Sequence, residues 1–174
     1  IQIGRMNRLR VDKAVEIGFY LAVDDETVES ILLPARYAPE DLAIDAEIDV
    51  FVYADSEDRL VATTETPLAM ANEVAYLQVV ATNPVGAFLD WGLPKDLLLP
   101  FGEQKGRPRE GDWCVVYVYK DKYAERLVAS MRLNRHIDKT AASYKPKEQV
   151  DVIIAARTDL GYKAVINDTH WGLL

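Results

Sequence analysis

The strongest constraint on this chain is an internal repeat. The stretch VFVYADSEDRLVAT at residues 50–63 returns 66 residues later as VYVYKDKYAERLVAS at residues 116–130, with one inserted residue. The tripeptide Leu-Leu-Pro recurs at the same offset, at residues 32–34 and 98–100. A third copy begins with Leu-Gly-Tyr at residues 160–162. Since self-similarity at a fixed period marks one structural unit per copy, we expect tandem small units rather than one large domain.

The repeat divides the chain at two places. It predicts a first unit over residues 1–66, a second over 67–138, and a linker with the start of a third over 139–174. Because the third copy stops in mid-motif, we expect this chain to be the N-terminal part of a longer protein whose further, C-terminal domains are missing.

Each unit has the pattern of short strands joined by turns. In the second unit we predict strands at 73–81, 86–90, 96–99, 113–119 and 126–131. Alternation along the fourth strand places Cys114, Val116 and Val118 on the core face and Val115, Tyr117 and Tyr119 on the other. Five short strands in so few residues leave no room for a crossover helix. The predicted fold class is therefore all-β, with tandem five-stranded antiparallel barrels of the OB-fold type.

The only cysteine, Cys114, cannot form an intrachain disulfide, which fits a reducing, cytoplasmic location. Its place on the core face predicts a buried structural thiol rather than a nucleophile. No nucleophile elbow, phosphate-binding loop, Cys-x-x-Cys or His-x-x-x-His motif is present. The acidic clusters at 24–26 and 55–58 lie in predicted turns, where Asp and Ser are favoured for backbone reasons. We therefore expect neither an enzyme, nor a metal site, nor a cofactor.

The segment VGAFLDWGLPKDLLLPF at residues 85–101 resembles strands two and three of the S-one RNA-binding domain, an OB-fold first described in a ribosomal protein. The family's glycine-aspartate turn and its alternating core strand also have counterparts, at Gly111-Asp112 and at Cys114, Val116 and Val118. The order of the three copies resembles the conserved virulence factor B family of bacterial RNA-binding proteins. This resemblance implies a regulatory RNA-binding protein in which three such domains precede a winged helix. The histidine that many S-one domains carry in strand three is absent, because that stretch reads Leu-Leu-Leu-Pro at 97–100.

Binding of single-stranded RNA needs aromatic side chains on which bases stack, next to cations that hold phosphates. The second unit supplies both kinds of residue. The candidate RNA-binding residues are Phe88, Trp91, Lys95, Phe101, Lys105, Arg107, Arg109, Tyr117 and Tyr119. Two alternatives remain open at this point: the aromatic rings can instead pack in a barrel core or against a neighbouring unit, and the basic loop can simply be solvated.

The net charge of −8 argues against nucleic-acid binding only for part of the chain. Residues 1–65 carry 6 basic and 15 acidic side chains, residues 66–138 carry 9 of each, and residues 139–174 carry 5 and 4. The acidity therefore belongs to the first unit, where it predicts a surface for a protein partner. The alternative to RNA binding is a protein-interaction scaffold whose barrels have lost RNA contact.

Overall fold

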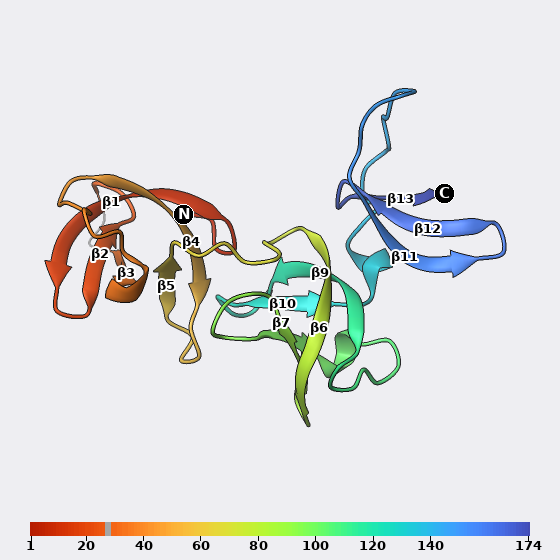
Figure 1. Cartoon of the computed structure of the whole chain (residues 1–174), viewed down its shortest axis with the longest axis horizontal. Coiled ribbons are helices and arrows are strands. Elements are labelled where there is room, and N and C mark those ends of the chain that lie inside the picture. Colours follow the sequence, from red (N-terminus) through yellow and green to blue (C-terminus); the bar gives the residue numbers. More distant parts are fainter. Residues whose placement is uncertain (27–28) are drawn as a thin grey trace. The chain divides into compact units, whose positions relative to one another are not determined.

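The computed structural model describes residues 1–26 and 29–174, and within them the regular secondary structure is almost entirely β-strand (Figure 1). The described residues form two compact units. One consists of Ile1–Ala71 with Gly92–Lys95 and Lys120–Leu127, and the other of Asn72–Trp91, Asp96–Tyr119 and Val128–Leu174. The helices of the described residues are single 3-10 turns, and none has the length and apolar character needed to span a membrane.

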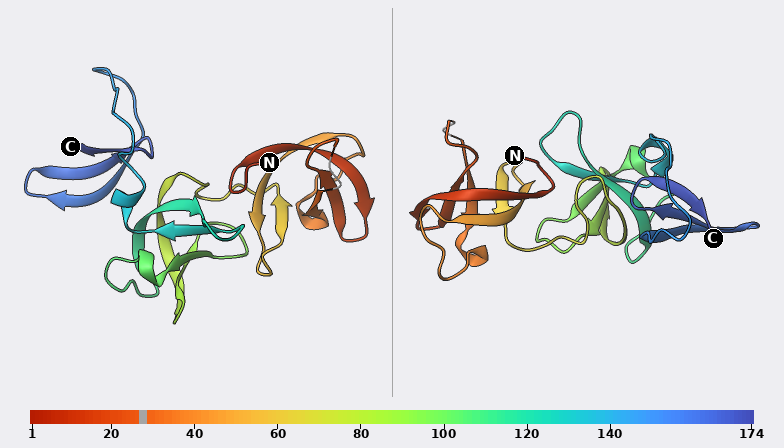
Figure 2. Two further views of the ribbon diagram at one scale, coloured as in Figure 1. Left: turned by 180° about the vertical axis from the view of Figure 1, so that it is seen from behind. Right: turned by 90° about the horizontal axis from the view of Figure 1, so that it is seen from above.

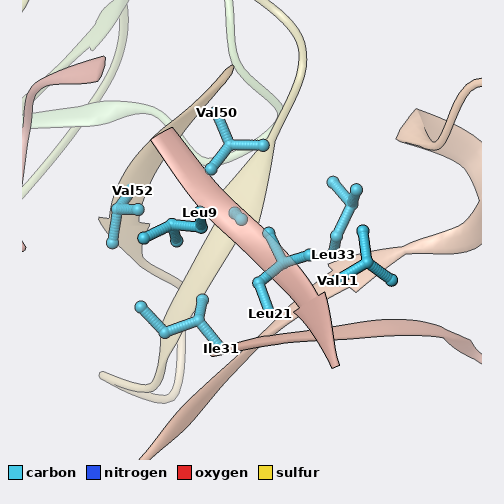
Figure 3. Close-up of a cluster of buried hydrophobic side chains, with 8 residues drawn as sticks. Leu9, Val11, Leu21, Ile31, Leu33, Val50 and Val52 are labelled. Carbon is cyan, nitrogen blue, oxygen red and sulfur yellow. The ribbon is translucent and has the colours of Figure 1, made fainter. Parts of the chain in front are cut away.

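The first five strands close into a barrel. They are β1 (Met6–Val15), β2 (Gly18–Ala22), β3 (Ser30–Pro34), β4 (Glu47–Ala54) and β5 (Leu60–Thr63), in the order β1-β2-β3-β5-β4. A short 3-10 turn, η1 (Ala35–Tyr37), follows β3. The core is formed by alternate residues of these strands, as Figure 3 shows: Leu9, Val11, Leu21, Ile31, Leu33, Val50 and Val52. Burial of such branched side chains is the main source of stability in so small a barrel.

The next five strands close a second barrel with the same topology. They are β6 (Val74–Asn83), β7 (Gly86–Asp90), β8 (Leu97–Pro100), β9 (Trp113–Lys120) and β10 (Leu127–Ser130), in the order β10-β8-β7-β6-β9. The 3-10 turns η2 (Phe101–Glu103) and η3 (Leu133–Arg135) follow β8 and β10. Cys114, Val116 and Val118 are buried, as strand alternation predicted. The prediction of tandem five-stranded barrels is confirmed, with the addition that β3–β5 and β8–β10 pair in parallel.

One glycine position explains part of the repeat. At Gly18, Gly86 and Gly161, an added Cβ would collide with the backbone carbonyl oxygen of Leu33, Leu99 and Leu174, respectively. Each glycine begins the second strand of its copy, where the third strand passes too close to leave room for any side chain. A register shift also occurs seven residues before each glycine, at Val11, Val79 and Ile154. The three copies therefore share their first two strands in detail.

The third copy is an open sheet of β11 (Val152–Thr158), β12 (Gly161–Ile166) and β13 (His170–Leu173), visible from two further directions in Figure 2. One face packs on the second barrel, where Val165 joins Val74, Leu133 and Ile137 in a buried cluster. The other face leaves Val152 and Ile154 exposed, at 43% and 45%. These two residues occupy the positions that Leu9 and Val11 fill in the first barrel core, counted back from the shared glycine.

Candidate nucleic-acid interface

Strands β7 and β8 present one aromatic ring to the outside of the second barrel. Ala87 and Leu89 are fully buried, so alternation turns Phe88 between them to the outer face, where it is half-buried. Phe88 pairs across the ladder with Leu98, which is also half-buried. The outer surface of these strands is therefore an apolar platform with a ring on it.

The loop Gly102–Asp112 follows β8 and brings three of the predicted residues together. Phe101 is 52% exposed, and the guanidinium carbon of Arg107 lies 5.9 Å from the centre of its ring. Phe101, Arg107 and Arg109 line a hollow of about 380 Å³, together with residues of the β6–β7 turn. We call it the loop hollow. Across residues 1–26 and 29–174, neither guanidinium is engaged in an ion pair. Both charges are therefore available to a phosphate.

The loop is held in place by its own polar groups. The backbone N–H of Arg109 donates to Oδ2 of Asp112 at 2.8 Å. The buried amide of Gln104 donates to the carbonyl oxygen of Leu99 at 3.1 Å. At the start of the loop, Glu103 accepts a hydrogen bond from Oγ of Ser130 at 2.6 Å. These bonds fix both ends of the loop and leave the arginine side chains free to reach a ligand.

Two of the predicted residues lie away from the loop hollow. Trp91 is only 2% exposed, so no base can stack on it in this structure. Nζ of Lys95 donates to the carbonyl oxygens of Ala54 at 3.0 Å and Asp55 at 2.7 Å, and burial lowers the pKa of this amine. Both side chains therefore make internal contacts in this structure, Trp91 by burial and Lys95 by its hydrogen bonds to the turn between β4 and β5.

Tyr117 and Tyr119 also make internal contacts. Both lie on the outer face of β9, as predicted, but their rings contact the ring of His136 at centroid distances of 4.8 Å and 4.6 Å. The hydroxyl of Tyr117 donates to Oδ1 of Asn72 at 3.1 Å, and burial raises its pKa. Burial also lowers the pKa of His136, whose Nε2 is buried without a hydrogen-bond partner among the described residues. In this structure the two tyrosine rings therefore pack against neighbouring side chains, which was the alternative to stacking on bases.

Lys105 lines a different groove, next to two exposed rings that were not among the sequence candidates. Tyr76 on β6 and Trp113 on β9 are 57% and 53% exposed, and their ring centroids are 5.1 Å apart. Because Leu77 and Cys114 are buried, strand alternation predicts that their neighbours Tyr76 and Trp113 point outward. The cross-strand register that brings them together was not predictable from the motif. Burial raises the pKa of the Cys114 thiol, which fits the predicted structural role.

Comparisons with known proteins agree with this architecture. Residues 3–65, which include the first barrel, match the S1, or S-one, domain. Protein YitL of Bacillus subtilis is 34% identical over 97 residues, covering 55% of this chain and 32% of YitL. Conserved virulence factor B of Staphylococcus saprophyticus is 24% identical over 147 residues, covering 75% and 49%. The chain thus spans half or less of the length of these relatives.

A solved structure shows the same fold over nearly the whole chain. This Streptococcus pneumoniae protein, described as a multidomain protein with nucleic acid binding domains, superposes with a TM-score of 0.63 at 16% identity. The match covers 98% of this chain and 61% of the pneumococcal one. Residues 3–65 thus match the S1 domain, a longer stretch of the chain is similar to conserved virulence factor B, and the chain shares the fold of the pneumococcal structure.

Proposed function

We propose that this chain binds single-stranded RNA through the outer face of β7–β8 and the loop hollow of the second barrel. The observation that carries the proposal is the meeting of Phe101 with Arg107 and Arg109 in one hollow beside the β7–β8 platform. An exposed ring and two cations free of ion pairs are the components from which proteins build single-strand sites. The outer face of strands two and three is also where OB-folds hold oligonucleotides.

The chemistry divides between the rings and the guanidinium groups. A base stacks on Phe101 or Phe88, while Arg107 and Arg109 neutralise the adjacent phosphates. Because every base has a π-face, stacking gives little sequence preference. Preference for RNA over single-stranded DNA follows from the family resemblance. The nucleic acid binding domains of the pneumococcal structure support the same class of ligand. A regulatory role in gene expression, exerted in the cytoplasm, belongs to the same proposal and depends on further domains and partners.

The proposal is tested by titrating labelled oligo(U) and oligo(A) with the chain at two salt concentrations, using fluorescence anisotropy. We expect salt-sensitive binding with similar affinity for both oligonucleotides. Phe101→Ala combined with Arg107→Ala and Arg109→Ala should weaken binding and make the slope of log K against log salt shallower by about 1.4, because each lost phosphate contact removes roughly 0.7. The matched control is Lys145→Gln with Lys147→Gln, which alters two exposed cations outside the hollow.

The first barrel favours a second function, the binding of a protein partner. Its surface arginines already form ion pairs: Arg8 contacts Glu47 and Asp49, and Arg10 contacts Asp45 at 3.1 Å. An excess of carboxylates with neutralised arginines repels phosphate and suits a basic protein surface. If oligonucleotide binding is absent or independent of salt, the RNA proposal is overturned and this scaffold function is the better account.

A further inference from the structure

The second barrel and the third sheet enclose a groove of about 820 Å³. On the barrel side it is lined by Tyr76 of β6 and Trp113 of β9, with Lys105 from the loop after β8. On the other side lie Arg157 of β11, Lys163 of β12 and Trp171 of β13. We call it the β6–β9 groove. Lys105, Arg107 and Arg109 belong to the same loop, but of these three only Lys105 lines the groove.

The charge of this groove is opposite to that of the chain. Three cations line it, and none of the described residues that line it is acidic. Lys105 and Arg157 form no ion pair anywhere in the described ranges, whereas Nζ of Lys163 lies 4.0 Å from the ring centre of Trp171. In a chain with eight more acidic than basic side chains, such a local excess of positive charge selects for an anionic ligand.

The groove also holds aromatic rings in fixed positions. Tyr76 and Trp113 lie against each other at an interplanar angle of 31°, and each exposes about half of its side chain. The indole N–H of Trp171 donates to Oδ1 of Asn134 at 2.9 Å, which fixes the orientation of that ring. Rings held in place beside unpaired cations fit a ligand that carries both flat bases and phosphates.

The first barrel shows that the fold does not require these residues. In the first barrel, Arg8 and Glu47 occupy the positions of Tyr76 and Trp113. The strand register shows the first equivalence, because Arg8 pairs with Asp49 as Tyr76 pairs with Val115. It shows the second in the same way, because Arg10 pairs with Glu47 as Gln78 pairs with Trp113. These two side chains form an ion pair in which Nε of Arg8 lies 2.9 Å from Oε2 of Glu47. Folding of the barrel therefore does not explain why Tyr76 and Trp113 stand at these positions in the second barrel.

We propose that the β6–β9 groove is a second contact site for single-stranded nucleic acid, with a base stacked on the Tyr76–Trp113 pair and phosphates held by Lys105 and Arg157. This inference rests on the proposed function and deepens it. The strand would contact one barrel at two separate places, which strengthens binding because the second contact becomes intramolecular once the first has formed.

The test follows each tryptophan separately by ¹⁹F NMR of the chain labelled with 5-fluorotryptophan. The three resonances are assigned by single Trp→Phe changes, and oligo(U) is then added. The Trp113 resonance should shift and saturate together with the anisotropy signal. The resonance of the buried Trp91 is the internal control and should stay in place.

Variants measure the contribution of the groove to affinity. Trp113→Leu should weaken oligo(U) binding by roughly 5- to 150-fold, the range that a lost base stack produces. Lys105→Gln with Arg157→Gln should make the salt slope shallower by about 1.4, whereas Lys145→Gln with Lys147→Gln should leave it unchanged. Thermal unfolding followed by circular dichroism shows whether Trp113→Leu still folds. If it does not, the surface charge variant decides.

The outcomes separate this inference from the proposed function. If the chain binds oligo(U), the loop-hollow variant loses affinity, and both the Trp113 resonance and the groove variants are unaffected, the groove proposal is wrong and the proposed function stands. If the unmodified chain does not bind oligo(U), both fail. Movement of the Trp113 resonance by an acidic peptide but not by oligo(U) would assign the groove to a protein ligand and overturn the proposal.

Discussion

The two closed barrels of this chain have the same frame but different surfaces. Both place a register shift seven residues before a glycine, and both join the third and fifth strands in parallel, through Leu32 with Val61 and Leu98 with Val128. Their outer faces differ elsewhere, although the equivalent ion pairs Asp55–Arg59 and Asp121–Arg126 occur in both. The first carries ion pairs around Arg8 and Arg10, and the second carries exposed rings and free arginines.

This difference shows which face of each strand the fold constrains. Inward residues must fill a close-packed core, so they repeat from barrel to barrel. Outward residues face solvent or a ligand and are free to change. Tyr20 is the structural equivalent of Phe88, because Tyr20 pairs with Leu32 as Phe88 pairs with Leu98. The neighbouring Phe19 packs against the first core instead.

The largest expected effect tests the shared frame. Leu21→Ala and Leu89→Ala remove equivalent, fully buried side chains, and each should destabilise its own barrel by about 2 to 5 kcal/mol because a cavity remains. Urea unfolding followed by tryptophan fluorescence measures the second barrel, and circular dichroism reports on both. If either substitution lowers the free energy of unfolding by less than about 1 kcal/mol, the core of that barrel repacks easily and the two frames are not equivalent.

The next effect tests the difference between the surfaces. Phe88→Ala should cost about 1 to 3 kcal/mol of oligo(U) binding, the value of one base stack. The equivalent change Tyr20→Ala, made together with Arg36→Ala, should leave affinity almost unchanged, because residues 1–65 carry 15 acidic against 6 basic side chains and repel phosphate. Fluorescence anisotropy measures both. Equal losses at Phe88 and Tyr20 would show that both barrels bind RNA.

A smaller effect distinguishes the two units by pH. Burial lowers the pKa of His136 below its ordinary value of 6.5, and both histidines of the chain lie in the second unit. Because the unfolded chain then binds the proton more readily, this contribution to stability is present above pH 6.5 and is lost as the pH falls toward the folded pKa.

Urea unfolding at a series of pH values, compared with His136→Phe, measures this contribution. The phenyl ring keeps the stacking on Tyr117 and Tyr119 but cannot be protonated. The variant should therefore lose part of the acid sensitivity of the second unit. An unchanged pH profile would show that His136 is not responsible.

The smallest effect concerns Cys114, which replaces Ile48 of the first barrel in the same strand register. Cys114→Val keeps an apolar side chain of similar volume and should change the free energy of unfolding by less than about 1.5 kcal/mol. The native thiol should react slowly with a thiol reagent, because burial raises its pKa. Rapid labelling of the folded chain would contradict the structural role.

Much of the fold could be predicted from the residues alone. Strand alternation placed Cys114, Val116 and Val118 inside the second barrel, and the repeat indicated a second copy of the same unit. The basic loop was identified because its arginines stand close together in sequence. The roles of Trp91 and Lys95 were not predictable, because whether a turn folds inward depends on what packs against it from elsewhere in the chain.

The sequence by itself determined the all-β class, the repeated barrel and the residues that fill each core, because alternation with period two and a glycine at a crowded crossing are local properties of a strand. Only the tertiary structure decided which polar and aromatic side chains are available to a ligand. Cross-strand register brought Tyr76 to Trp113, loop closure brought Arg107 to Phe101, and packing against His136 covered Tyr117. The first and third of these contacts join residues far apart in sequence, and the second depends on how the loop closes, so none of them follows from the local strand pattern.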